Sequence, residues 1–276
     1  MKKLLVAISL TIFASLCFTS IAGLVFAQKA GYEIADYEAI TVPTIDGTWS
    51  STDEWTDASE VQLEQLGDEE SGAFFRIKHS TDLGTGDITY YYLLVEVLND
   101  TTNDSEDLLQ ICIVGAEEVG GTPEVTTMPD ENCIRFDYEG HDVSGFWAYR
   151  GTGSGWTTET NYTWETDILI VDSFDVSPLS DTPHLIIEVK ISAAVFNINP
   201  EYWIRVATFD ESVTSSLGMK MWPIGSREDP NDWGRVEVVT ESIPELPAWT
   251  ILPIFVTATL AVALYKKRLA SSETKP

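Results

Sequence analysis

Basic residues are scarce in this chain. Its 276 residues include 16 Lys and Arg against 44 Asp and Glu, which gives a formal net charge of −28 at pH 7. A surface this negative repels nucleic acid and anionic lipid, because both carry negative charge themselves. The composition therefore excludes nucleic acid as a partner, whereas it favours solubility and attracts cations.

Histidine is scarce as well, with 3 residues in the chain. His79, His141 and His184 are scattered, and no H-E-x-x-H or G-x-S-x-G sequence occurs. Carboxylates are so abundant that none can be singled out as the acid and base pair of a glycosidase. The sequence thus predicts a protein that is not an enzyme.

Cysteine is equally rare, and Cys17 lies in an N-terminal segment that we expect to be removed. Cys112 and Cys133 remain as an even pair in an exported chain, so a disulfide is the natural interpretation. It would close a loop of about 20 residues and contribute roughly 3 kcal/mol by constraining the unfolded chain. Two buried free thiols are the alternative, and a zinc site is disfavoured because no pair of histidines is near.

Long apolar runs occur at the two ends of the chain. The first begins with Met-Lys-Lys and closes with Val-Phe-Ala, which is typical of a secretory signal peptide. The second carries no charge and precedes Lys-Lys-Arg, which indicates a transmembrane helix with its basic end in the cytoplasm. We expect a single-pass membrane protein with its main domain at the cell surface. The expected order is signal peptide 1–27, exported domain 28–239, stalk 240–247, transmembrane helix 248–265 and cytoplasmic tail 266–276.

The exported part lacks helical periodicity and contains many short runs typical of strands. Residues 89–98 (TYYYLLVEVL) and 108–114 (LLQICIV) are rich in aromatic and β-branched side chains. Residues 132–138 (NCIRFDY) alternate between polar and apolar, as a half-buried strand does. Turns containing glycine or proline separate these runs. We therefore expect an all-β protein, a single antiparallel β-sandwich.

Several stretches resemble family 9 carbohydrate-binding modules and the related DOMON-type sandwiches. The first reads TIDGTWSSTDEWTDA, and the last contains W-P followed by DPNDWGRV. The matching stretches are, in order, residues 44–58, 92–100, 107–114, 132–138 and 222–236. They are spread over roughly residues 40–240, nearly the whole exported domain, and this resemblance implies a non-catalytic module that binds a glycan or surface polysaccharide. A structural or adhesive surface protein with the same fold and no sugar binding is the alternative.

The resemblance also implies a set of binding residues. Family 9 modules hold a sugar between two tryptophans, with polar groups at the rim. By position in the pattern, Trp222 would be one ring, and Arg135, Asp137 and Gln110 would be the polar groups. Packing of Trp222 and a surface pair of Arg135 with Asp137 are the alternatives. The loop that should carry the second ring has no aromatic residue, so a ring would have to come from elsewhere: Trp147, Trp156 or Trp164.

Acidic side chains gather between two of the expected strands. Asp100, Asp104 and Asp107 offer hard oxygen ligands, and calcium binds about 6–8 such oxygens. The loop lacks the glycine and the terminal glutamate of an EF-hand. Many family 9 modules carry structural calcium, so the resemblance implies a Ca²⁺ site at these three residues. A solvated loop is the alternative.

Two further features depend on the expected export. Asn99, Asn103 and Asn161 begin glycosylation sequons, which indicates a glycoprotein. Related DOMON domains bind haem through methionine and histidine or lysine, so a haem-binding redox domain is another alternative. Its ligands would come from three residues: Met219, Met221 and His141.

The C-terminal segment has a second interpretation. Pro244-Glu245-Leu246, the apolar span and the basic cluster resemble the PEF-type sorting signals of archaeal surface proteins. This resemblance implies an archaeosortase-type processing enzyme as a partner, which would cut the tail and re-anchor the protein. Leucine stands where those signals have phenylalanine, and a plain membrane anchor is the alternative.

Overall fold

The computed structural model describes residues 32–65, 71–115, 117–119, 122–124, 128–195, 201–213 and 218–239. The expected signal peptide, stalk, transmembrane helix and cytoplasmic tail lie outside these residues and stay predictions. Among the residues described, no helix is both long enough and apolar enough to cross a membrane.

Strands make up most of the described chain, as the sequence predicts. The strands are β1 (Glu33–Glu38), β2 (Ser59–Gln62), β3 (Glu64–Gln65), β4 (Ala73–Thr81), β5 (Ile88–Val97), β6 (Leu108–Gly115), β7 (Glu117–Val119), β8 (Thr122–Glu124), β9 (Ile134–Glu139), β10 (Phe146–Gly151), β11 (Trp156–Glu159), β12 (Ile168–Ser177), β13 (Ser180–Ser192), β14 (Glu201–Phe209), β15 (Met219–Trp222) and β16 (Gly234–Val239). The helical segments are short: α2 (Thr52–Trp55), η1 (Val143–Gly145), η2 (Ala193–Val195) and η4 (Pro230–Asp232).

One curled sheet contains all of these strands except β7 and β8, which pair with each other. Its main path runs β11-β10-β9-β6-β14-β16-β1-β4-β5-β13-β12. β1 pairs in parallel with both β16 and β4, and it thereby joins the two halves of the sheet. The expectation of a purely antiparallel sandwich is wrong at this seam, because β1 runs in the same direction as both of its neighbours.

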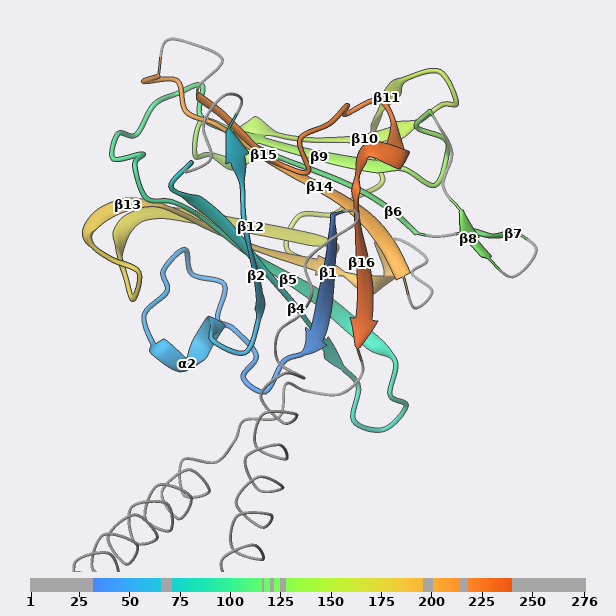
Figure 1. Ribbon diagram of the computed structural model, residues 1–276, viewed down its shortest axis with the longest axis horizontal. Helices are drawn as coiled ribbons and strands as arrows, with labels where there is room; N and C mark the ends of the chain where they lie inside the picture. Colours follow the sequence, from blue (N-terminus) through green and yellow to red (C-terminus); the bar gives the residue numbers. More distant parts are fainter. Residues whose placement is uncertain are drawn as a thin grey trace, which may run out of the picture.

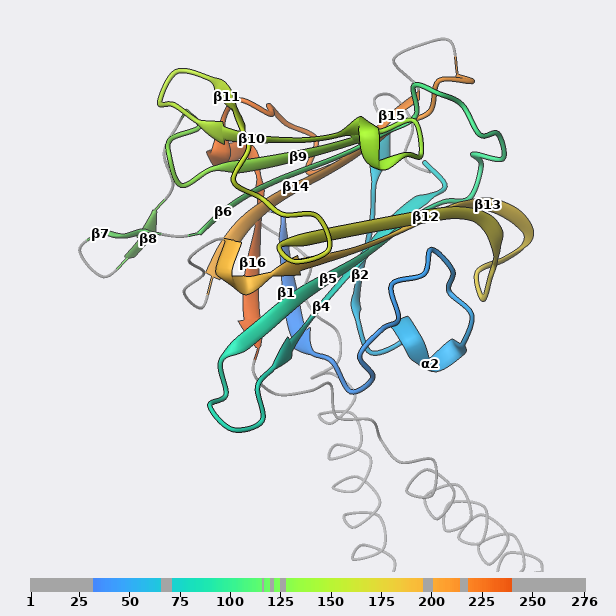
Figure 2. The same ribbon diagram turned by 180° about the vertical axis from the view of Figure 1, so that it is seen from behind.

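The two halves of the curled sheet face each other across the main core. One half holds β6, β9, β10 and β14, and the other holds β4, β5, β12 and β13 (Figure 1 and Figure 2). The ring of Tyr91 on β5 lies 5.5 Å from that of Tyr202 on β14. Tyr138 on β9 donates a hydrogen bond of 2.6 Å to Asp172 on β12. These contacts between the halves give the sheet the layered form of a sandwich.

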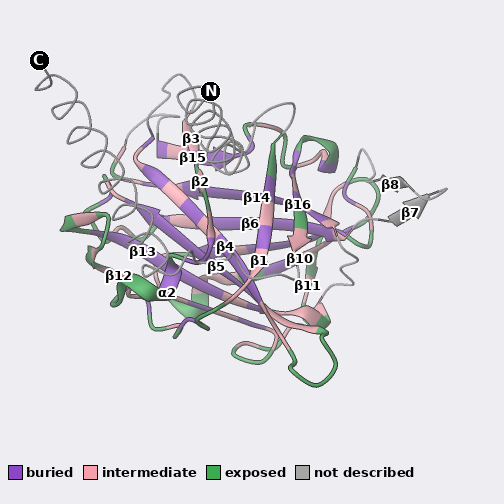
Figure 3. Cartoon of the chain, turned by 60° about the horizontal axis from the view of Figure 1, so that its bottom comes forward, coloured by how far each residue is buried: buried purple, intermediate pink, exposed green. Residues whose placement is uncertain are grey.

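A second, smaller core covers the outer face of β5 and β13. Trp49 and Trp55, from the segment around α2, pack there against Tyr92 and Leu94. Trp55 Nε1 also donates to Glu188 Oε1 at 2.8 Å. Because both faces of β5 are covered, all its residues from position 91 to position 97 are buried (Figure 3). Both tryptophans are therefore packing residues of this second core.

The two cysteines are separate thiols, so the predicted disulfide is wrong. Cys112 on β6 and Cys133 just before β9 are both buried and unpaired. In the ladder, Cys112 lies opposite Arg135, two residues along from Cys133. The two cysteines are therefore diagonal neighbours, about 7–8 Å apart, whereas a disulfide needs Cβ atoms at about 3.8 Å. Burial raises the pKa of each thiol to about 12.

Candidate functional site

Four neighbouring strands present a common face on the side away from the main core. Ladder partners share a face because side chains alternate along each strand. Trp147 on β10 lies opposite Asp137 on β9, which lies opposite Gln110 on β6. Gln110 in turn lies opposite Ala207 on β14. We call these four residues the first row.

A second row runs beside the first on the same face. Tyr149 on β10 lies opposite Arg135, and Arg135 lies opposite Cys112. Cys112 lies opposite Arg205 on β14. The alternating sequence of β9 predicts that Arg135 and Asp137 share a face, and the pairing of the strands adds the residues beside them.

Hydrogen bonds connect the polar members of the two rows. Arg135 makes two bonds to the carboxylate of Asp137, at 3.1 Å and 2.7 Å. Gln110 Nε2 donates to Asp137 Oδ1 at 3.0 Å. Arg205 donates to Gln110 Oε1 at 3.0 Å. The three residues predicted as polar ligands are thus held in one network across β9 and β6, and Arg205 extends it to a third strand, β14.

Aromatic rings flank this network on the β10 and β11 side. Trp147 is 50% exposed, next to Asp137. The guanidinium of Arg135 lies 3.9 Å from the ring centre of Tyr149 and 5.5 Å from that of Trp156. Trp156 is stacked on Trp233, with ring centres 6.4 Å apart and an angle of 8°. Of the tryptophans proposed to supply the missing ring, Trp147 offers the most open surface.

Trp222 does not belong to this face. It lies opposite Val206 in the ladder, so it points into the main core on the other side of the sheet from Gln110. Its ring is only 4% exposed and packs against Phe75. A Cβ atom at Gly234 would overlap the ring. This corrects the expected placement, because a ring enclosed in this way has no face open to a surface ligand.

Trp164 is likewise part of the main core rather than the site. Its ring packs edge-on against Phe146 and parallel to Tyr138.

A pocket of 260 Å³ adjoins the β14 end of the first row. It lies between residues of three strands, β6, β14 and β15, and the segment that follows β15. Its lining is Leu108, Gln110, Arg205, Ala207, Thr208, Met219, Arg227 and Glu228. Ligand pockets commonly measure about 300–1,000 Å³, so this one suits a single small group of a larger ligand. Sequence reasoning missed Arg205, because nothing near it in the sequence indicates that β14 lies beside β6.

No family model matches the chain, and no curated protein matches it. Two solved structures are similar. One is a carbohydrate-binding module of family 9 from Caldicellulosiruptor kristjanssonii in complex with cellotriose, with 11% identity, a TM-score of 0.49, and coverage of 78% of this chain and 97% of that chain. The other is a module of the same family and organism in complex with glucose, with 14% identity, a TM-score of 0.47, and coverage of 78% and 100%. This is the family that the sequence motifs resemble, but a likeness at this level does not carry a site or a ligand to this chain.

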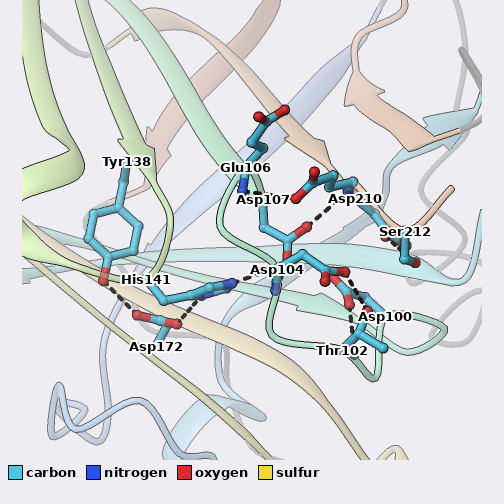
Figure 4. A network of polar contacts seen from close by, with 11 residues as sticks. Asp100, Thr102, Asp104, Glu106, Asp107, Tyr138, His141, Asp172, Asp210 and Ser212 are labelled. Carbon is cyan, nitrogen blue, oxygen red and sulfur yellow. Dashed lines mark hydrogen bonds and ion pairs between the residues drawn. The ribbon is translucent and has the colours of Figure 1, made fainter. Parts of the chain in front are cut away.

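A second group of functional interest is a buried carboxylate cluster (Figure 4). Asp100, Asp107 and Asp210 each offer an oxygen within 4.8 Å of the others, and all three residues are buried. Asp104 is outside the cluster and instead accepts a hydrogen bond of 2.7 Å from Thr102. Asp210 replaces it from a distant part of the chain, which the sequence could not indicate.

Two oxygens of the cluster have no hydrogen-bond partner in the described part of the chain. Oδ2 of Asp100 and Oδ2 of Asp210 are both buried and unpartnered. Asp107, by contrast, accepts from the backbone of Glu211 at 2.9 Å and faces His141 Nε2 at 3.1 Å. Burial, with the charges of Asp107 and Asp210, raises the pKa of Asp100 to about 7. The cluster therefore holds negative charge that its described neighbours only partly compensate.

Lys220 brings a buried positive charge to the neighbourhood of the cluster. It is buried, and its Nζ donates to Asn99 Oδ1 at 2.8 Å. Burial lowers its pKa, whereas attraction to the three carboxylates opposes that effect. The carboxylates of the cluster offer oxygen ligands, which a hard divalent cation such as Ca²⁺ prefers.

The described histidines all face carboxylates. His141 contacts Asp172 through Nδ1 and Asp107 through Nε2. Its ring is therefore engaged on both nitrogens and offers neither to a haem iron. The proposed methionine ligand Met221 is likewise engaged, because its sulfur accepts from Arg205 at 3.3 Å.

The glycosylation sequons all lie at the surface. Asn99, Asn103 and Asn161 are exposed. The amide oxygen of Asn99 accepts a hydrogen bond from Lys220. For Asn103 and Asn161, the observation is surface exposure. Glycosylation stays a prediction.

Proposed function

We propose that this protein is a non-catalytic glycan-binding protein and that the two rows on β10, β9, β6 and β14 are its binding surface. The observation that carries the proposal is the exposed ring of Trp147 beside the hydrogen-bonded network of Asp137, Gln110 and Arg205. Sugars have apolar C–H faces and a rim of hydroxyl groups. A flat aromatic ring covers the face, and charged or amide groups bind the hydroxyls.

The length of the first row supports an oligosaccharide as the ligand rather than a single sugar. Neighbouring strands lie about 4.8 Å apart, so Trp147 on β10 and Ala207 on β14 are separated by about 14 Å. The polar groups lie between these ends and are fixed by one another. A surface held in place before binding loses little conformational freedom when the ligand arrives.

The experiment is a glycan array probed with the purified full-length protein. Trp147→Ala should abolish binding to any glycan that the wild type retains, whereas Trp147→Phe should keep much of it because a flat ring remains. Leu83→Ala is the control, since Leu83 is fully exposed on the hairpin between β4 and β5. If no glycan binds the folded wild type, the proposal fails, and the structural or adhesive alternative takes its place.

A second proposal concerns the carboxylate cluster. Asp100, Asp107 and Asp210 would hold a divalent cation, with Ca²⁺ as the ion that their oxygen ligands favour. The two unpartnered buried oxygens support this, because a bound cation would compensate them. The role would be structural: Asp100 and Asp107 lie on the loop between β5 and β6, Asp210 follows β14, and a shared ion would fasten these two segments together.

The location of the protein is a third proposal and rests on sequence alone. Residues 1–27 and 248–265 would place the domain outside the cell, either anchored as a single-pass protein or re-anchored after cutting by an archaeosortase-type enzyme. Protease added to intact cells should digest the domain. Mass measurement of the mature protein should show whether the C-terminal span is retained.

A further inference from the structure

Arg205 is a buried cation that no carboxylate of the described residues binds. It is 5% exposed, and the acceptors around its guanidinium are Gln110 Oε1 and the sulfur of Met221, with the thiol of Cys112 close by. Its Nε–H has no hydrogen-bond partner among the residues that the structure describes. Every acceptor that the described residues give to Arg205 is therefore uncharged, although this chain has far more carboxylates than bases.

The other arginines near the site have carboxylate partners. Arg135 is paired with Asp137 at 2.7 Å, and Arg227 with Glu228 at 2.7 Å. Arg227 and Glu228 line the pocket together with Arg205, so the lining carries one net positive charge. Burying an unpaired charge is unfavourable, and burial accordingly lowers the pKa of Arg205. An anion in the pocket would remove this penalty.

We propose that the pocket at Arg205 binds an oxyanion substituent of a sugar, a carboxylate or a sulfate, so that the ligand is an acidic glycan. This inference rests on the proposed function and specifies its ligand class. The ring of Trp147 then stacks on a neutral part of the glycan, and the anionic group enters the pocket about three strands away, next to Gln110. An arginine fork suits an oxyanion because its N–H groups bond two oxygens at once.

Because the overall charge is −28, we expect the pocket to select glycans with few negative charges and not to attract every anion. At physiological salt, exposed charges are screened beyond about 8 Å, so the repulsion from the rest of the surface acts weakly on a group at the pocket. A contact with a buried guanidinium is screened much less. A glycan with a single anionic substituent therefore binds more tightly through Arg205. A glycan with a negative charge on every sugar is still repelled by the acidic surface around the pocket.

The experiment compares three probes on the purified full-length protein by calorimetry at physiological salt. They are a glucan trisaccharide with one terminal glucuronate, the methyl ester of the same molecule, and the same trisaccharide with one sulfate in place of the carboxylate. We expect the acid or the sulfate to bind about tenfold or more tightly than the ester, since a hydrogen bond to a charged group is worth more than a neutral one. The tighter of the two identifies the substituent.

Variants test whether Arg205 is the source of the preference. Arg205→Met should bring the acidic probes to the affinity of the ester, and Arg205→Lys should keep part of the difference. Arg150→Met is the matched control, because Arg150 is paired with Glu159 and alternates to the other face of β10 from Trp147. If Arg205→Met does not fold, the affinities of the wild type for the acid and for the ester still decide whether the protein prefers a negatively charged substituent.

The outcomes separate the inference from the proposed function. Equal binding of all three probes, lost in Trp147→Ala, overturns the inference and leaves the glycan-binding function standing. Absence of binding to these probes and to the whole glycan array overturns both. A preference for the acid that persists in folded Arg205→Met also overturns the inference, since the charge would then be recognised elsewhere.

Discussion

Trp147 and Asp137 are direct cross-strand partners, one on β10 and the other on β9. The ring of Trp147 is half exposed, whereas the carboxylate of Asp137 is fixed by Arg135 and Gln110. A flat apolar ring and an oriented carboxylate thus lie next to each other. This pairing requires two adjacent strands, and neither residue suggests the other in the sequence.

Asp137→Asn tests the polar half of the pair. The amide keeps the shape of the side chain but loses the charge that holds Arg135, so glycan affinity should fall about tenfold. Titration of an array-positive glycan into the variant measures this. Glu139→Gln, on the same strand and face but exposed at its end, is the control and should bind as the wild type does. Unchanged affinity in Asp137→Asn would remove Asp137 from the site.

Gly234→Ala tests the packing of Trp222. The new Cβ atom would overlap the enclosed ring, so the ring or the strand must shift, which costs about 1–3 kcal/mol of unfolding free energy. Denaturant unfolding measures the loss. Gly84→Ala is the control, because its nearest neighbour is a side-chain oxygen of Asp82 at 3.1 Å. Equal stability of the two variants would contradict the buried position of Trp222.

Calcium should raise the melting temperature, and a chelator should lower it. Binding at a concentration of 100 times the dissociation constant would stabilise the fold by about 2.7 kcal/mol. Asp210→Asn should remove this response, because it takes a carboxylate from the cluster. Asp104→Asn should keep it, since Asp104 is outside the cluster. A wild-type melting temperature that is the same with and without the chelator would rule out the cation.

Glu188→Gln should destabilise the segment around α2 and change the pH dependence of stability. Oε2 of Glu188 accepts from the backbone of Asp46 and Gly47, and Oε1 accepts from Trp55. In either orientation, the NH₂ group of glutamine would face an N–H donor that Glu188 now accepts from. This should lower the free energy of unfolding by about 1–3 kcal/mol. Denaturant unfolding at several pH values measures both effects.

The sign of the pH effect follows from the pKa of Glu188. Burial raises it to about 7, although the hydrogen bonds from Trp55, Asp46 and Gly47 oppose the rise. The folded state therefore holds this proton more tightly than the unfolded state. The resulting stabilisation is complete below about pH 4.5 and is lost as the pH rises through 7. Subtracting the curve of Glu188→Gln from that of the wild type should isolate this slope, and a flat difference would contradict the raised pKa.

The thiols of Cys112 and Cys133 should be free and unreactive. Their raised pKa keeps them protonated, and the thiolate is the reactive form. Mass spectrometry after alkylation in denaturant without reductant should find two modified cysteines, whereas the native protein should resist modification. An intact disulfide would appear as unmodified cysteine in both samples.

Local sequence patterns predicted the parts of this protein that depend on neighbours in the chain. The alternation of residues 132–138 placed Arg135 and Asp137 on one face, and the aromatic and branched runs located β5 and β6. Both predictions depend on the two-residue period of a strand, which the sequence displays directly.

The sequence also determined the β class and the excess of negative charge, because composition and periodicity are properties of the chain alone. Only the tertiary structure decided that Trp222 faces the core, that Asp210 joins Asp100 and Asp107, and that Arg205 lies beside Gln110. The period of a strand fixes which side chains share a face, but it does not say which face is buried or which strand lies next to it. Those depend on how distant strands pair around β1, and that pairing brings the site together.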